Sequence, residues 1–377
     1  MASSTLNILV TGANGFIGKN LVAHLNEETN VRVIKYLREN DRNKLKEYVS
    51  AADIVVHLAG ENRPKRQEDF VDTNEKLTRD VCQFIQENYY SSGKSTPIIF
   101  ASSKQATSNN PYGVSKLHAE QEIMKLRDEI NNPCTIYRLP GVFGKWCKPN
   151  YNSVVATFCY NIAHGIPINI HDAHKELELV YIDDVVNCVI DKIFALEFEN
   201  LWSIVEPTYK ISLGSLANEL RLLHQNHFTL NVSNVGTGLR RALYATYISY
   251  LPNQSFCYPI DVHRDARGNF VEFIKTQNNG QISYFSAFPG VTRGQHYHHT
   301  KSEKFLVVKG KALFKFRDLN TGEAVEIQAD GDNPKIVTTI PGWAHDVTNI
   351  GSDEMLVLVW ANEVFDPERP DTFRYKV

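Results

Sequence analysis

Over the first 140 residues, short apolar runs alternate with longer amphipathic stretches. The apolar runs predict five strands, at Leu6–Val10, Val31–Tyr36, Asp53–Leu58, Pro97–Ala101 and Cys134–Arg138. Stretches between them, such as Ser115–Ile130, are long enough for crossover helices. Apolar strands that alternate with helices predict an α/β domain, in which helices cover both faces of a doubly wound parallel sheet.

The pattern changes further along the chain. Residues 150–225 are mixed, with a helix expected after Tyr181, and the polar, glycine-containing residues 226–256 are typical of a connector. From about residue 257 the chain predicts short strands, for example Phe270–Lys275, Lys304–Val308, Ala312–Arg317 and Met355–Trp360. We therefore expect two domains: 1–245, with a substrate-binding part from about 150, and an all-β sandwich or small barrel at 246–377.

Composition narrows the possible partners. The net charge of −3 gives no electrostatic footprint for nucleic acid or an anionic membrane. The 377 residues contain no apolar run long enough to cross a bilayer, and the start shows no signal-peptide pattern. Six scattered cysteines without a CxxC pair are typical of reduced thiols. We expect a cytoplasmic protein with no nucleic-acid partner and no membrane insertion.

The first strand runs into a glycine-rich turn, TGANGFIG, at residues 11–18. Gly12 permits a tight turn, Gly15 lets the backbone approach a pyrophosphate, and Gly18 lets the next helix pack closely on the sheet. The helix N-terminus then offers free N–H groups to phosphates. A strand before and an amphipathic helix after the turn predict a Rossmann-like dinucleotide site.

The end of the second strand bears on the choice of cofactor. It reads Tyr36-Leu37-Arg38, with no acid before Glu39 to bind a ribose 2′-hydroxyl. The guanidinium of Arg38 suits a 2′-phosphate, although a solvated surface arginine is the alternative. We therefore predict NADPH as the cofactor.

Tyr112 and Lys116 lie one helical turn apart in PYGVSK. An ammonium beside a phenol lowers the phenol's pKa, so this pair predicts a proton donor, with Ser103 as a second hydroxyl on the same substrate oxygen. Tyr90 and Lys94 have the same spacing but fall near a polar loop before a strand. The order of elements favours Tyr112.

TGANGFIG, DIVVHLAG, FASSK and PYGVSK, in this order, resemble the extended short-chain dehydrogenase/reductase family that acts on nucleotide sugars. The resemblance covers about the first 240 residues and implies Ser103, Tyr112 and Lys116 as the catalytic set, with Asn74 as a structural asparagine. Only eight residues separate Ser103 from Tyr112, fewer than is usual in the family, so Ser102 stays an alternative hydroxyl. The expected cofactor-binding set is Gly12, Asn14, Gly15, Phe16, Ile17, Gly18, Arg38, Leu58, Ala59, Gly60, Tyr112 and Lys116.

A histidine cluster follows in the β-rich part. In a strand, His296 and His298 point the same way, so both can grip one metal ion, with Glu303 and His345 completing the set. Three imidazoles and a carboxylate suit Zn²⁺, with Mn²⁺, Fe²⁺ or Ni²⁺ as alternatives. His299 points across the pleat and is expected to face solvent rather than act as a base. Both His171 and His174 are expected on the surface.

The spacing of His296, His298 and Glu303 resembles the first cupin motif, so the resemblance implies a C-terminal cupin barrel. Together the two domains resemble a family of bifunctional enzymes of capsular polysaccharide synthesis. That resemblance implies a UDP-linked 4-keto-6-deoxy amino sugar as substrate, C3 epimerisation by the cupin, NADPH reduction at C4 to UDP-N-acetyl-6-deoxy-L-talosamine, and a homodimer. Epimerisation comes first, because C3–H is acidic only while C4 is a ketone.

Three further cations, Arg63, Lys145 and Lys148, are candidate diphosphate contacts by charge and position. Two other functions stay open. In the first alternative, the cupin is only a binding or dimerisation module, and the protein is a plain 4-ketosugar reductase. In the other, a retained NADP⁺ serves a dehydratase or 4-epimerase, although no acid lies beside Tyr112 or Ser103.

Overall fold

The computed structural model describes residues 5–64, 66, 68–229, 231–260, 263–265, 268–270, 274–276, 280–363 and 366–377. These divide into two compact units, which we describe separately. The first comprises residues 1–153 and 177–210, and the second comprises residues 154–176 and 211–377. The domain boundary predicted at residue 245 stays a prediction. No helix in the described part of the chain is long and apolar enough to cross a membrane.

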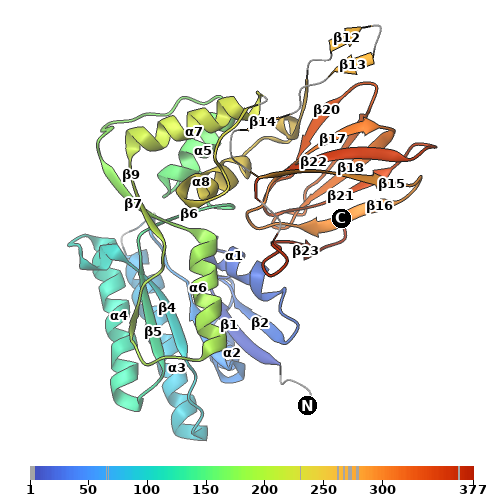
Figure 1. The fold of residues 1–377 in the computed structure, drawn as a ribbon. Helices are drawn as coiled ribbons and strands as arrows, with labels where there is room; N and C mark the ends of the chain where they lie inside the picture. The colour runs from blue at the N-terminus through green and yellow to red at the C-terminus, as the bar shows by residue number, and fades with distance from the viewer. Residues whose placement is uncertain are drawn as a thin grey trace. The chain divides into compact units, whose positions relative to one another are not determined.

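The first unit is built on a parallel sheet in the order β2-β1-β3-β4-β5-β8 (Figure 1). Its strands are β1 (Leu6–Thr11), β2 (Val31–Tyr36), β3 (Ile54–His57), β4 (Ile98–Ser103), β5 (Cys134–Leu139) and β8 (Trp202–Ser203). The predicted doubly wound parallel sheet and its five strands are thus confirmed. A smaller sheet contains β6 (Gly141–Phe143), β7 (Glu176–Tyr181) and β9 (Thr208–Ser212).

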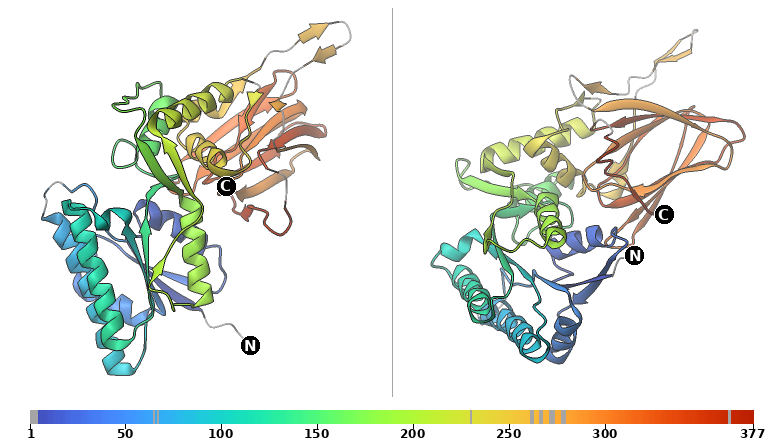
Figure 2. Two further views of the ribbon diagram at one scale, coloured as in Figure 1. Left: turned by 60° about the vertical axis from the view of Figure 1, so that its left-hand side comes forward. Right: turned by 60° about the horizontal axis from the view of Figure 1, so that its bottom comes forward.

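Helices cover both faces of the parallel sheet (Figures 1 and 2). One face packs against α2 (Arg42–Ala51), α3 (Leu77–Ser92) and α4 (Pro111–Ile130), which share a core of fully buried side chains such as Leu9, Val55 and Ile123. On the other face, α1 (Phe16–Leu25) contacts α6 (Ile182–Ala195), the helix expected after Tyr181.

The order of strands places a topological switch point at β1, which lies between β2 and β3. Ligands of open α/β sheets bind at the carboxyl ends of strands at such a point. The glycine turn follows β1, and residues 58–60 follow β3, so two of the predicted cofactor-binding segments meet there.

The second unit contains α5 (Val154–Ala163), α7 (Leu213–His227) and α8 (Gly238–Ile248), which contact one another. The connector predicted over residues 226–256 is therefore wrong. Its polar, glycine-containing start is followed by GLRRALYATYI, and residues 242–248 of that helix are all buried. The burial of this apolar face outweighs the flanking turn residues.

The predicted β-rich part contains two antiparallel sheets, ordered β11-β20-β17-β22-β15 and β19-β18-β21-β16-β23. Their strands are β11 (Cys257–Pro259), β15 (Gln281–Ala287), β16 (Thr292–Tyr297), β17 (Glu303–Lys309), β18 (Lys311–Asp318), β19 (Ala324–Asp330), β20 (Lys335–Thr338), β21 (Trp343–Asn349), β22 (Met355–Ala361) and β23 (Phe373–Arg374). The all-β prediction is confirmed, but among the described residues the strands form two sheets and not a closed barrel.

Short strands complete this unit: β10 (Asn231–Val232) pairs with β14 (Lys275–Thr276), and β12 (His263–Asp265) pairs with β13 (Gly268–Phe270). The strand predicted over Phe270–Lys275 lies partly outside the described residues. Single turns of other helix types occur at η1 (Val71–Lys76), η2 (Lys104–Thr107) and η3 (Asn253–Phe256).

Candidate active sites

The glycine turn leaves no room for side chains where a dinucleotide is expected. Gly12 has φ +67°, and a Cβ there would lie 2.7 Å from the backbone nitrogen of Ala59. A Cβ on Gly18 would lie 2.2 Å from the carbonyl oxygen of Gly12. The N-cap of α1, Gly15, makes no side-chain cap, so the first amides of the helix remain available to phosphates. The turn therefore fits a pyrophosphate.

A buried hydrogen-bond network that the sequence analysis did not find holds Thr11, the first residue of this turn. His57 contacts the Thr11 hydroxyl through Nδ1 at 2.6 Å and the Thr78 hydroxyl through Nε2 at 2.8 Å. The amide of Ala59 donates to the same Thr11 oxygen at 3.2 Å. Burial lowers the pKa of His57 to about 3, so the ring is neutral and serves to connect β1, β3 and α3.

Arg38 lies beyond the end of β2 with an exposed guanidinium, 3.0 Å from Glu61. Glu61 also accepts a 2.6 Å hydrogen bond from the Tyr151 hydroxyl. Burial alone would raise the pKa of Glu61, but the bonds from Tyr151 and Arg38 hold it below its ordinary value. The sequence analysis did not name Glu61 as a site residue, although it directly follows the predicted cofactor-binding segment Leu58–Gly60.

Asn74, the residue expected to be structural, binds the backbone of Glu61 from both sides. Its Oδ1 accepts from the Glu61 amide at 2.7 Å, and its Nδ2 donates to the Glu61 carbonyl at 3.0 Å. The same amide donates to Ser115 Oγ at 2.9 Å, and Ser115 donates to the carbonyl of Tyr112 at 2.8 Å. Asn74 thus links the loop after β3 to the start of α4.

The predicted proton donor lies in the first turn of α4, which Asn110 caps through the amide of Gly113. The Tyr112 hydroxyl contacts the hydroxyl of Ser103 at the end of β4. Ser102 is buried instead, and its hydroxyl donates to Glu120 at 2.5 Å. This geometry favours Ser103 over Ser102.

Lys116 is almost fully buried and donates to the carbonyl of Ala101 at 2.8 Å. Burial lowers its pKa to about 8. Burial also raises the pKa of Tyr112, and only the Ser103 hydroxyl offsets this rise. Lys116, whose ammonium is bound to the Ala101 carbonyl, is not among the causes of the Tyr112 shift, so the expected lowering of the phenol's pKa by Lys116 stays a prediction.

The remaining candidate site residues of the first unit differ in their exposure and in their partners. Tyr90 is 70% exposed near the end of α3, away from the switch point, so it is not a second site. Lys145 is buried, with its ammonium 2.7 Å from Asp183, which corrects its assignment as a diphosphate contact. Arg63 and Lys148 are exposed.

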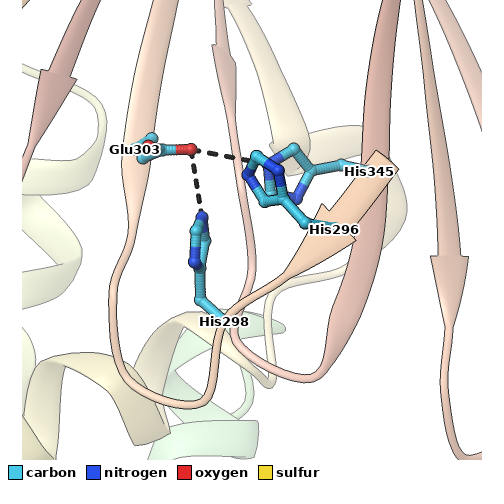
Figure 3. A group of neighbouring side chains, drawn as sticks. All are labelled: His296, His298, Glu303 and His345. Atoms are coloured by element: carbon cyan, nitrogen blue, oxygen red, sulfur yellow. Dashed lines mark hydrogen bonds and ion pairs between the residues drawn. The ribbon is translucent and has the colours of Figure 1, made fainter. Parts of the chain in front are cut away.

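The metal-ligand prediction brings four side chains together. His296, His298, Glu303 and His345 each offer a ligand atom within 4.8 Å of the others (Figure 3). Glu303 Oε2 lies 3.2 Å from His298 Nε2 and 3.4 Å from His345 Nε2. Glu303 comes from one antiparallel sheet, and His296 and His345 come from the other.

The polar atoms of these four side chains fit a divalent metal ion. In the described part of the chain, neither ring nitrogen of His345 has a hydrogen-bond partner of good geometry, although the side chain is buried. Burial alone would raise the pKa of Glu303, but the imidazoles of His298 and His345 hold it well below its ordinary value. One carboxylate and three imidazoles are a suitable donor set for Zn²⁺.

A cavity of about 270 Å³ opens beside these residues. His296, Glu303 and His345 line it together with apolar side chains and Arg293. The expectation that His299 faces solvent is wrong: the residue is 4% exposed, and its ring packs on Phe373. His171 and His174 are exposed, as expected.

Residues 8–197 match the model of the NAD dependent epimerase/dehydratase family, and the chain belongs to this family. Residues 263–373 match the model described as the polysaccharide biosynthesis C-terminal domain.

The chain is also similar over nearly its whole length to individual proteins that carry both parts. It is 49% identical to the UDP-2-acetamido-2,6-beta-L-arabino-hexul-4-ose reductase of Pseudomonas aeruginosa, over 99% of each chain. It is 41% identical to the capsular polysaccharide assembling protein CapF from Staphylococcus aureus, with a TM-score of 0.67, covering 99% of this chain and 100% of that one. The chain is also similar to the dTDP-4-dehydro-6-deoxyglucose reductase of Escherichia coli, at 27% identity over 59% of this chain and 82% of that protein.

Proposed function

We propose that this chain is a bifunctional nucleotide-sugar enzyme. Its second unit epimerises C3 of a UDP-2-acetamido-2,6-dideoxy-4-ketohexose. The first unit then reduces the C4 ketone with NADPH to UDP-N-acetyl-6-deoxy-L-talosamine, on the route to UDP-N-acetyl-L-fucosamine for surface polysaccharide. Full-length similarity to CapF and to a UDP-4-ketosugar reductase supports this assignment.

Two observations support the reductase half: the Tyr112 hydroxyl contacts Ser103, and Lys116 Nζ would lie 3.2 Å from a Cβ on Gly60, in the predicted cofactor-binding segment after β3. Bound NADPH supplies the hydride that C4 of the sugar receives. Tyr112 donates its hydroxyl proton to the C4 oxygen, and Ser103 hydrogen-bonds the same oxygen. The Lys116 ammonium, one helical turn from Tyr112, stabilises the phenolate that remains until solvent returns the proton.

The NADPH preference rests on Arg38, whose exposed guanidinium suits a 2′-phosphate. Replacing Arg38 with alanine is expected to weaken NADPH binding about tenfold or more while leaving NADH binding unchanged. Arg32→Ala, which removes an exposed arginine on β2, the strand that precedes Arg38, is the matched control. Equal losses for both nucleotides would contradict the preference.

His296, His298, Glu303 and His345 carry the epimerase half, because they would hold a divalent ion against the cavity. Two antiparallel sheets that contribute ligands to one site support the cupin prediction. The C4 ketone acidifies C3–H, and an ion there would supply positive charge that favours the resulting enolate. The cavity is slightly smaller than the roughly 300–1,000 Å³ pockets of drug-sized ligands, so it suits a sugar ring rather than a whole UDP-sugar.

One experiment tests both halves. The full chain is incubated with the UDP-4-ketosugar in D₂O, first without and then with NADPH. We expect deuterium at C3 in the first stage and stoichiometric NADPH oxidation in the second. NADPH oxidation without C3 deuterium would leave a plain reductase with a structural or dimerising module. Deuterium without oxidation would refute the reductase half and favour a dehydratase or 4-epimerase. The homodimer, the cytoplasmic location and the predicted domain boundary stay predictions.

A further inference from the structure

The C-terminal segment of the chain, residues 366–377, lies along the strand that carries the first histidine of the proposed metal centre. β23 pairs with β16, so that Arg374 is opposite His296 and Phe373 is opposite Tyr297. The next amide, of Tyr375, donates to the carbonyl of Gln295 at 2.8 Å. The segment therefore holds the backbone on one side of the site.

Asp371 makes a denser set of contacts to the loop between His298 and Glu303. Its Oδ1 accepts from the amide of His299 at 2.9 Å. Its Oδ2 accepts from the amide of Thr300 at 2.9 Å, the hydroxyl of Thr300 at 3.0 Å and the amide of Lys301 at 2.7 Å. One carboxylate thus fixes three consecutive backbone amides, which fixes the path of the loop between two of the four ligands.

The backbone of Asp371 contacts a ligand directly. His298 Nδ1 lies 2.6 Å from the Asp371 carbonyl oxygen, which can only accept, so Nδ1 carries the proton. Nε2 is then the nitrogen left to ligate a metal ion, and it lies 3.2 Å from Glu303 Oε2 (Figure 3). Asp371 presents this carbonyl with φ +37°, a left-handed conformation that aspartate and asparagine tolerate better than most residues.

We infer that Asp371 is the positioning residue of the metal centre: its carbonyl sets the tautomer and direction of His298, and its carboxylate holds the loop to Glu303. The inference rests on the proposed metal site. A partner of this kind on the second nitrogen of a ligating histidine orients the ring and raises its basicity. Sequence reasoning had no access to this role, because about 70 residues separate Asp371 from the loop.

The test measures binding of Co²⁺ to the full-length protein after removal of metal with a chelator. Asp371→Asn keeps the left-handed backbone but sets an NH₂ group against at least one of the four donors, and Asp371→Ala removes the carboxylate. The matched control is Asp366→Asn in the same segment, because the carboxylate of Asp366 accepts only from the amide of Glu368 in the described contacts. The readouts are the Co²⁺ dissociation constant, the visible absorption of bound Co²⁺ at saturation, and the melting temperature of the metal-free protein.

We expect both Asp371 variants to bind Co²⁺ about 10–100-fold more weakly and to shift its absorption band, while Asp366→Asn matches the wild type. NADPH binding checks that the first unit of each variant is folded, and a cooperative melting transition of the metal-free protein checks the second unit. A lower melting temperature with unchanged affinity and spectrum would show a merely structural role and overturn the inference. A wild-type protein that binds no Co²⁺ would overturn it together with the metal centre, whereas unchanged variants of a metal-binding protein would overturn it alone.

Discussion

Among single residues, Tyr112 carries the chemistry of the proposed reduction. Replacing it with phenylalanine removes the donated proton and keeps the ring, so we expect kcat for NADPH-dependent reduction to fall about 10²–10⁴-fold. Nucleotide affinity, measured by fluorescence titration, is expected to change little. Tyr90→Phe is the control, because this tyrosine has the same spacing to a lysine and is exposed. Full turnover by Tyr112→Phe would contradict the assignment.

Lys116 gives the reduction a distinct pH dependence. Burial lowers its pKa to about 8, so the ammonium is present below this pH and is lost as the pH rises through it. The pKa of Tyr112 is raised, so the phenol loses its proton only at higher pH. We therefore expect kcat/KM to fall above about pH 8, and Lys116→Arg, which stays charged, to move this limb upward. An identical alkaline limb in Lys116→Arg would assign it to another group.

The sequence predicted those site residues whose role depends on a local pattern. Gly12–Gly18, Tyr112 with Lys116, and His296 with His298 each form a short motif with a stated geometry. Glu61 and Asp371 have no such motif, because their roles arise from partners that are 90 and about 70 residues away. A spacing of four residues also could not show that the Lys116 ammonium donates to the backbone carbonyl of Ala101.

Among the secondary-structure elements, α1 depends most on a single position. Gly18 lets the helix approach the turn, and an added Cβ would lie 2.2 Å from the carbonyl oxygen of Gly12. The clash is with backbone, so Gly18→Ala must displace the helix start, at a cost of about 1–3 kcal/mol. We expect a lower melting temperature and at least tenfold weaker NADPH binding, both measurable on the purified protein. Lys19→Ala, at the next position in the helix, is expected to bind NADPH normally; equal losses in both variants would contradict this explanation.

Elements were predictable where one pattern dominated. The five parallel strands are continuous apolar runs that are buried on both faces, and such runs have few alternative structures. α8 was missed because the preceding polar residues read as a connector, while the reason for the helix is tertiary: its buried face packs on α5 and α7. A pattern of short strands left both a sandwich and a small barrel open, because strand pairing is not encoded locally. Over the residues that it describes, the structure has two sheets rather than one closed barrel.

At the scale of the whole molecule, the proposed function combines two chemistries that use different atoms of one sugar. The C3 step requires the C4 ketone, and the C4 step destroys it. The residues proposed for the two steps lie in different units, with Tyr112 in the first and His345 in the second. Each step can therefore be abolished separately, and the order of the steps is fixed by the substrate rather than by the way the units are arranged.

This separation predicts that two variants, each lacking one of the two steps, restore the complete reaction when they are mixed. Tyr112→Phe is expected to introduce deuterium at C3 without oxidising NADPH. His345→Gln removes one metal ligand, so it is expected to lose C3 exchange yet to oxidise NADPH with a sugar that already has the epimerised C3. An equimolar mixture should then regain NADPH oxidation from the unepimerised sugar, because the 4-keto intermediate diffuses from one molecule to the other. Normal turnover by His345→Gln alone would remove the second unit from the chemistry. A mixture that stays inactive while each variant keeps its own step would show that the intermediate is not released.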